Sequence, residues 1–143
     1  MANYHFIGIQ PDGNFLADID FATCPATQFR FVTVASTAGK VKLGSGTCNP
    51  APVGVLQNSP SAGEGAQIIV VGYTKLVGRN ATCNIRYGTF VVAASDGVAE
   101  AMAVPPGSVI AARWYGPAIT TGSAIGDAYI FGAGFAVCAV SAS

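Results

Sequence analysis

The sequence predicts an all-β fold of about ten short strands with at most one short helix, arranged as a barrel or a sandwich. Short apolar runs rich in Val, Ile, Phe and Tyr recur along the chain, as is typical of strands. Turn-forming sequences, such as residues 11–13 (Pro-Asp-Gly) and 95–97 (Ser-Asp-Gly), separate these runs. Pro50, Pro52 and Pro60 exclude a helix from residues 43–63.

The length of 143 residues suits a single folding unit, which we divide into an N-terminal arm at residues 1–28 and a β domain at residues 29–143. Within the arm, residues 15–21 mix aromatic with acidic side chains and fit a strand or one helical turn equally well. The arm either lays its aromatic side chains on a neighbouring subunit or forms a first strand in the same core. The sequence favours neither alternative.

The first strand of the β domain is predicted at residues 29–35, which alternate with period two and are rich in β-branched side chains. A turn at residues 36–39 leads into residues 40–43, where charged and apolar side chains alternate as in a strand with one wet face. We therefore predict a hairpin between these two strands.

The next two strands, at residues 53–57 and 66–71, are apolar without alternation. Continuous apolar character predicts that both faces of these strands are covered. Gly72 then predicts a bulge or bend, through which the chain changes direction or sheet into a strand at residues 73–77.

The last third of the chain contains a hairpin and two or three further strands. Residues 87–93 and 98–102 are joined by a tight turn at Asp96 and Gly97, although Ala, Glu and Met at 98–104 also fit a helical turn. Further strands are expected at residues 108–115, 127–131 and 135–140, the last two forming one long bent strand or a pair. An end this apolar is expected at the centre of a sheet or under another chain.

Charge is scarce: 10% of the residues are charged, 51% are hydrophobic and the formal net charge is zero. Without a broad positive field, neither nucleic acid nor an anionic membrane surface is an expected partner. A neutral and apolar surface favours self-association, so we expect an obligate partner or an oligomer. The alternative is a compact monomer coated with Ser, Thr and Gly.

No secretory signal is predicted, because residues 1–6 have no basic region and no long apolar region. No membrane span is predicted either, because the most apolar stretch, residues 128–140, is interrupted by glycine and shorter than the roughly 20 residues that a spanning helix needs. Cys24, Cys48, Cys83 and Cys138 are too far apart for a typical zinc site. We expect them to be reduced and mostly buried, with a disulfide between Cys48 and Cys83 as the alternative.

The residues that catalysis requires are mostly missing. His5 is the single imidazole, so any Ser-His-Asp or Cys-His system would depend on it. Asp18 and Asp20 would share one face of a strand, where acid–base work or a divalent ion is conceivable, but a solvated acidic edge is the simpler interpretation. We expect no enzyme activity, no cofactor, no metal and no small-molecule substrate.

Arginine beside aromatic residues occurs at Arg30 and at Arg113, a combination that can stack on single-stranded nucleic acid. The neutral total argues against that role, and such residues are also enriched at protein interfaces. The residues predicted to contact a partner are Tyr4, Phe6, Phe15, Phe21, Arg113, Trp114 and Tyr115.

Residues 39–132 contain five short motifs of Gly and apolar residues: 52–58 (PVGVLQN), 61–65 (SAGEG), 68–75 (IIVVGYTK), 88–97 (GTFVVAASDG) and 126–130 (GDAYI). In these motifs the chain resembles the capsid cement, or decoration, proteins of tailed bacteriophages. The arm and the apolar end after Phe131 depart from the simplest members of that family.

The resemblance implies a small β-barrel or tulip-like β domain, usually trimeric, that is made in the host cytoplasm and sits on the virion. There it bridges neighbouring major capsid proteins on the outside of the head. A β module of a phage tail, fibre or baseplate is the alternative, and a small β-fold enzyme or binding domain is a more distant one.

Overall fold

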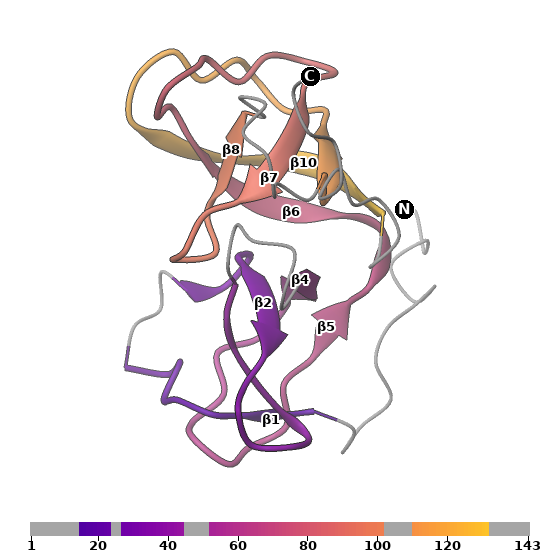
Figure 1. Ribbon diagram of the computed structural model, residues 1–143. Coiled ribbons are helices and arrows are strands. Elements are labelled where there is room, and N and C mark those ends of the chain that lie inside the picture. The colour runs from indigo at the N-terminus through magenta and orange to yellow at the C-terminus, as the bar shows by residue number, and fades with distance from the viewer. Residues whose placement is uncertain (1–14, 24–26, 45–51, 102–109, 132–143) are drawn as a thin grey trace, which may run out of the picture.

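The computed structural model describes residues 15–23, 27–44, 52–101 and 110–131. Over these ranges the chain forms ten β-strands in two sheets and no α-helix, which confirms the predicted all-β class (Figure 1). No helix long and apolar enough to span a membrane is found in the described part of the chain.

The first sheet has five strands in the order β1-β3-β2-β4-β5. Its strands are β1 (Leu16–Ala17), β2 (Phe31–Val34), β3 (Lys40–Leu43), β4 (Pro52–Leu56) and β5 (Ile68–Ile69). β2 and β3 pair antiparallel, which confirms the predicted hairpin. β1 pairs with β3 in parallel, so part of the N-terminal arm belongs to this sheet.

The second sheet is a closed barrel of five strands in the order β10-β6-β8-β7-β9. Its strands are β6 (Val71–Arg79), β7 (Phe90–Ala93), β8 (Ala99–Ala101), β9 (Ala112–Trp114) and β10 (Ser123–Phe131). β7 and β8 form the predicted hairpin with Gly97 at φ +78°, so the helical alternative is wrong for residues 99–101. β10 lies between β6 and β9, as an apolar strand requires; residues 135–140 lie outside the described ranges.

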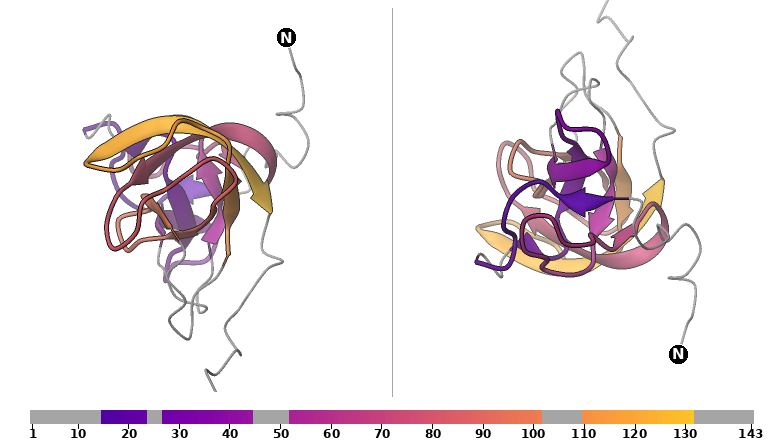
Figure 2. Two further views of the ribbon diagram at one scale, coloured as in Figure 1. Left: turned by 90° about the horizontal axis from the view of Figure 1, so that it is seen from above. Right: turned by 90° about the horizontal axis from the view of Figure 1, so that it is seen from below.

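The chain passes from one sheet to the other at Val70. β5 ends at Ile69 and pairs with β4 in the first sheet, whereas β6 begins at Val71 and pairs with β10 in the barrel. Gly72 has φ +123°, which few residues other than glycine tolerate, but it is already the second residue of β6 and pairs with Ile130, so the predicted change of sheet occurs two residues earlier, at Val70. Figure 1 shows the barrel above the first sheet, and the two views of Figure 2 look along the direction in which they are stacked.

The first sheet is covered on both faces, which explains the continuous apolar runs of the sequence. On β2, Phe31 belongs to the core of the barrel and its neighbour Val32 to the core on the other side of the sheet. On β4, Val55 and Leu56 divide in the same way, and all four side chains are fully buried. The sheet is therefore the middle layer between two cores.

The described part of the N-terminal arm belongs to the second of these cores. Ala17 and Phe21 are fully buried there, and Phe15 packs against the cluster with part of its side chain exposed. For residues 15–23 the arm is a first strand and its loop rather than a separate element. The proposed boundary at residue 28 therefore does not separate these residues from the β domain.

Candidate functional site

The most distinctive surface of the described molecule is a row of outward-facing side chains that crosses four of the five barrel strands. Tyr73 on β6 lies directly opposite Tyr129 on β10, Tyr129 lies opposite Arg113 on β9, and Arg113 lies opposite Phe90 on β7. Their neighbours along each strand point inward and are buried, except Thr74 on β6, which is partly exposed. Alternation within each strand and register between strands together bring these four residues onto one face.

Further aromatic rings extend this row into a continuous surface, which we call the aromatic face. Ring centroids lie 4.9 Å apart for Tyr73 and Tyr129, 5.9 Å for Tyr129 and Phe131, and 6.1 Å for Phe131 and Phe90. The other pairs join Tyr115 to Tyr73 at 6.0 Å and to Tyr87 at 5.5 Å. These spacings are typical of interacting rings. The face comprises Tyr73, Tyr87, Phe90, Arg113, Tyr115, Tyr129 and Phe131.

Much of this aromatic surface is open to solvent. Tyr87 is 74% exposed, Phe90 42% and Tyr73 40%, while the other three rings are half-buried. A contiguous, solvent-exposed apolar patch of this kind typically marks an interaction site, because its burial against a partner is favourable.

Arg113 provides the positive charge of the aromatic face. Its Cζ lies 5.3 Å from the centroid of the Phe90 ring and 5.8 Å from that of Tyr115, both within cation–π range. Its Nε donates a hydrogen bond of 3.1 Å to the carbonyl oxygen of Gly88. Among the described residues no carboxylate pairs with this guanidinium.

Two hollows indent the aromatic face and share Tyr115 in their walls. The larger, of about 420 Å³, is lined by Phe90, Ile110, Arg113, Tyr115 and Phe131. The smaller, of about 300 Å³, is lined by Tyr73, Tyr87, Tyr115 and Asp127. Asp127 accepts a salt bridge from Lys75 Nζ at 2.7 Å, so the smaller hollow carries a compensated charge.

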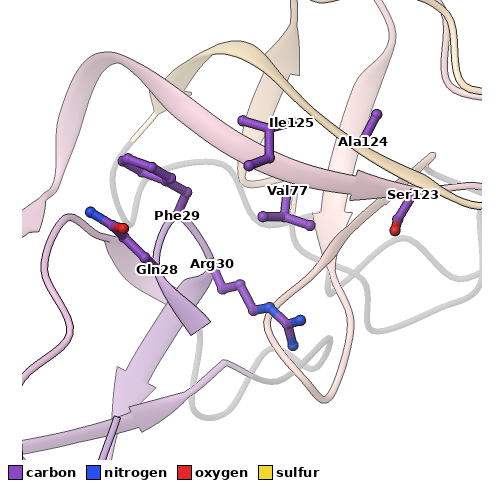
Figure 3. A pocket seen from close by; sticks show the side chains of 7 residues that line it. All are labelled: Gln28, Phe29, Arg30, Val77, Ser123, Ala124 and Ile125. Atoms are coloured by element: carbon purple, nitrogen blue, oxygen red, sulfur yellow. The ribbon is translucent and has the colours of Figure 1, made fainter. Parts of the chain in front are cut away.

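A third hollow, of about 330 Å³, lies where the first sheet meets the barrel. Figure 3 shows residues 28–30 on one side of it and residues of β6 and β10 on the other. Phe29 takes φ +63° here, held by hydrogen bonds from its N–H to Leu56 and from Val77 to its carbonyl. These bonds tie the two sheets together, and they account for a backbone conformation that a phenylalanine seldom adopts.

An ionic cluster stabilises the same junction. Arg79 on β6 donates to Asp96 at 2.7 Å and, through Nε, to Glu100 at 3.0 Å, while Arg30 donates to the Asp96 carbonyl at 3.3 Å. Burial by itself raises the pKa of Asp96, but hydrogen bonds from Arg79 and Val98 and the charges of Arg79 and Arg30 outweigh it and leave that pKa lowered. Hydrogen bonds to Asp96 and then Glu100 raise the pKa of Arg79. The cluster therefore has a structural role, which is to hold the first sheet and the barrel together.

The other candidates for chemistry do not assemble into a site within the described ranges. There, no group of three or more His, Cys, Asp or Glu side chains is placed to hold a metal ion. Asp18 and Asp20 follow β1 in a bend, where Asp20 Oδ1 accepts a hydrogen bond from the Ala22 N–H at 3.0 Å. His5 lies outside the described residues.

Cys83 meets one part of the expectation for the cysteines and not the other. It carries a free thiol, as expected, so the alternative disulfide with Cys48 is not formed, but it is exposed rather than buried. Cys24, Cys48 and Cys138 lie outside the described residues.

The predicted partner-contact residues fall into three groups. Arg113 and Tyr115 are part of the aromatic face, whereas Tyr4 and Phe6 lie outside the described residues. Phe21 and Trp114 have no exposed surface and belong to the two cores, which corrects their predicted role, and Phe15 is half-buried against one core. Trp114 points inward because it alternates with the outward-facing Arg113 on β9, whereas Tyr115 follows directly after the strand.

The sequence interpretation missed five members of the aromatic face. Tyr73, Tyr129 and Phe131 lie at alternate outward positions of β6 and β10, but their alignment depends on a register between distant strands. Tyr87 and Phe90 join them through the pairing of β7 with β9. The available signal was the concentration of Tyr and Phe in the strands of the second half of the chain.

Comparison of the chain with protein-family models and with curated proteins finds no match.

Proposed function

We propose that this protein is a structural virion component, a capsid cement or decoration protein that binds the outside of a phage head and stabilises contacts between major capsid proteins. The observation that carries the proposal is the aromatic face, a contiguous and partly solvent-exposed patch of six rings around one arginine. The resemblance of residues 39–132 to cement proteins and the scarcity of charge support it.

The proposed mechanism is passive. Copies associate as trimers, and each trimer buries apolar surface against neighbouring capsid subunits, which holds them together against the pressure of the packaged genome. Aromatic residues are well suited to such contacts because they bury a large area with few rotatable bonds, and arginine because its planar guanidinium stacks on rings and donates several hydrogen bonds. Because many copies act on one particle, a modest affinity at each site is sufficient.

This role requires no catalytic group, cofactor or small-molecule substrate, and it places the protein on the virion surface after synthesis in the host cytoplasm. The partner surface is protein rather than nucleic acid or membrane, in keeping with the zero net charge.

The experiment is co-sedimentation of purified protein with expanded empty capsids of the phage that encodes it, with light scattering to give the oligomeric state. Wild-type protein should be trimeric and should sediment with the capsids. The Tyr73→Ser/Tyr87→Ser variant should bind less, because it removes two exposed rings of the face. The control is Ile19→Ser/Val34→Ser, which removes two exposed apolar side chains away from the aromatic face, one after β1 and one on β2, and should bind like wild type.

A monomer that does not bind capsids would contradict the proposal, and so would equal losses in the two double variants. Antibody labelling of intact virions gives an independent answer. Label on the head supports a cement role, whereas label confined to the tail, fibres or baseplate would replace it with the alternative structural role.

A further inference from the structure

We infer that the larger hollow of the aromatic face is a receptor for an acidic side chain, Asp or Glu, carried on an apolar segment of the partner protein. The inference deepens the proposed function and rests on it for the identity of the partner. The chemistry of the hollow can be tested without that partner.

The guanidinium of Arg113 is held in place before any partner arrives. The Phe90 and Tyr115 rings lie on it at 5.3 and 5.8 Å, and Nε is bound to the Gly88 carbonyl at 3.1 Å. The Gly88 N–H in turn donates to the Trp114 carbonyl at 2.7 Å, which ties this loop to β9. An arginine that is fixed in this way loses little entropy on binding.

The two terminal nitrogens of Arg113 remain available. No hydrogen bond or ion pair from the described residues engages Nη1 or Nη2, whereas Nε is already used. These nitrogens form one edge of a planar fork, and that edge matches the two oxygens of a carboxylate.

Two other cations on the outer surface of the barrel are already neutralised, and a third, Arg86, lies outside the hollow. Arg79 is saturated by Asp96 and Glu100, and Lys75 is paired with Asp127 at 2.7 Å. An incoming carboxylate would therefore find its complementary charge at Arg113, and the barrel offers it no competing unpaired cation within the aromatic face.

The walls of the hollow determine what must accompany the carboxylate. Apart from Arg113, the lining consists of the hydrophobic or aromatic side chains of Phe90, Ile110, Tyr115 and Phe131, and the volume of about 420 Å³ accommodates a side chain of the partner. Partial desolvation by these walls strengthens the ion pair. An acidic residue flanked by apolar ones fits both features.

The first test uses 3-phenylpropionate and its neutral amide as probes, with binding followed by NMR of isotope-labelled protein. The acid should shift the Arg113 Nε–H and the Gly88 and Tyr115 amide signals, and the amide should bind at least about tenfold more weakly. Arg113→Met, which keeps the apolar stem, should abolish the preference. The control is Arg86→Met, because Arg86 is exposed and lies outside the hollow.

Equal affinity for acid and amide, or an unchanged preference in Arg113→Met, would overturn the inference. A spectrum of the Arg113→Met variant that retains the wild-type dispersion shows that the variant is folded. If it is not, Arg113→Lys serves instead, since it keeps the charge, loses the fork and should weaken acid binding.

The second test identifies the partner group. A carbodiimide should join the lysine introduced by Arg113→Lys to a carboxylate of the major capsid protein on assembled particles, and Arg86→Lys should give no such product. Mass spectrometry of the cross-linked peptide then separates an Asp or Glu side chain, which supports the inference, from a chain terminus or no product, which contradicts it. Failure of wild-type protein to bind capsids at all would instead remove the proposed function, leaving the probe titration to decide the chemistry of the hollow.

Discussion

At the scale of single residues, Trp114 and the glycines around it explain how a small barrel holds its largest side chain. Trp114 is fully buried and donates from Nε1 to the Pro117 carbonyl at 2.9 Å. A Cβ added at Gly126 would lie 2.4 Å from Trp114 Cζ2, so no larger residue fits unless the indole moves. The barrel thus accommodates one indole by leaving out a side chain on β10.

Gly126→Ala is therefore expected to destabilise the protein by about 1 to 3 kcal/mol through overpacking. The measurement is urea unfolding followed by the fluorescence of the single tryptophan. Gly65→Ala is the matched control, because a Cβ at Gly65 meets no atom within 4 Å. Equal midpoints for the two variants would contradict the packing argument.

Asp96 gives the molecule a pH dependence with a defined sign. Its pKa is lower in the folded protein than the 3.8 of a free aspartate, so the unfolded state binds the proton more readily. The stabilisation is complete above that value and is lost as the pH falls through the folded pKa. Asp96→Asn should therefore be less stable than wild type near neutrality, by roughly 1 kcal/mol or less because the side chain is 41% exposed.

The measurement is urea unfolding of wild type and Asp96→Asn at a series of pH values from neutral to about 3. The difference between them should shrink as the pH falls below 3.8. In an Arg79→Met background, which lacks the main partner of Asp96, most of the difference should be gone at every pH. A difference that is independent of pH would show that charge is not its cause.

Single residues also show where sequence interpretation works and where it fails. Residues 113–115 were all predicted to contact a partner, yet alternation on a strand sends the middle one inward. The identity of Arg113 and Tyr115 as surface residues followed from their type. The rings that surround them did not, because cross-strand neighbours depend on register between segments that are distant in sequence.

At the scale of elements, β2 and β4 have no solvent-facing side over most of their length. Consecutive side chains on β4 enter different cores, Val55 that of the barrel and Leu56 that of the first sheet. The apolar runs predicted this double cover. The short-range hairpins were predicted too, because a few consecutive residues determine each turn.

Truncation of two consecutive residues on β4 should therefore destabilise the protein at both positions. Leu56→Ala should cost about 2 to 5 kcal/mol and Val55→Ala somewhat less, because each leaves a cavity in a different core. The measurement is chemical denaturation, with Val34→Ala, whose side chain is 43% exposed, as the control with a small effect. A negligible cost at either β4 position would contradict the double-faced packing.

The parallel pairings could not be predicted from the sequence. β1 pairs with β3, and β6 pairs with β8, but no local turn joins either pair of strands and so no turn sequence indicates the pairing. Such pairings are decided by how the whole chain packs, so local patterns leave them open.

At the scale of the whole molecule, the sheet and the barrel share a core. Phe31 and Val55 reach from the sheet into the barrel cluster that contains Leu76 and Trp114. Backbone hydrogen bonds such as that from Phe31 N to the Gly97 carbonyl, at 2.8 Å, cross the same junction. The two parts are therefore expected to unfold as one cooperative unit.

This cooperativity can be checked with two probes. Trp114 fluorescence reports on the barrel, and hydrogen exchange of the Leu56 amide, which is bound to the Arg30 carbonyl at 2.9 Å, reports on the sheet. Both should give the same free energy of unfolding, and Phe31→Ala should lower both together by about 3 to 5 kcal/mol. Loss of the sheet signal at a lower denaturant concentration would mean that the two parts are independent.

The closure of the barrel by β10 has a consequence for how the protein is made. β6 is synthesised well before its long antiparallel partner, β10, which is the last strand that the structure describes, and β9 also needs β10 to complete the ring. Two such distant segments must be brought together, at a cost in chain entropy, before their contacts can stabilise the pairing. This makes folding slow. A chain still emerging from the ribosome can form the β2–β3 hairpin and pair β4 with it. β6, which carries Tyr73, can pair with β10 only after β10 has been synthesised. The aromatic face needs Tyr129 in register with Tyr73 and Arg113, so we expect it to form only after β10 has been made, which would keep an exposed apolar surface from forming on an unfinished chain.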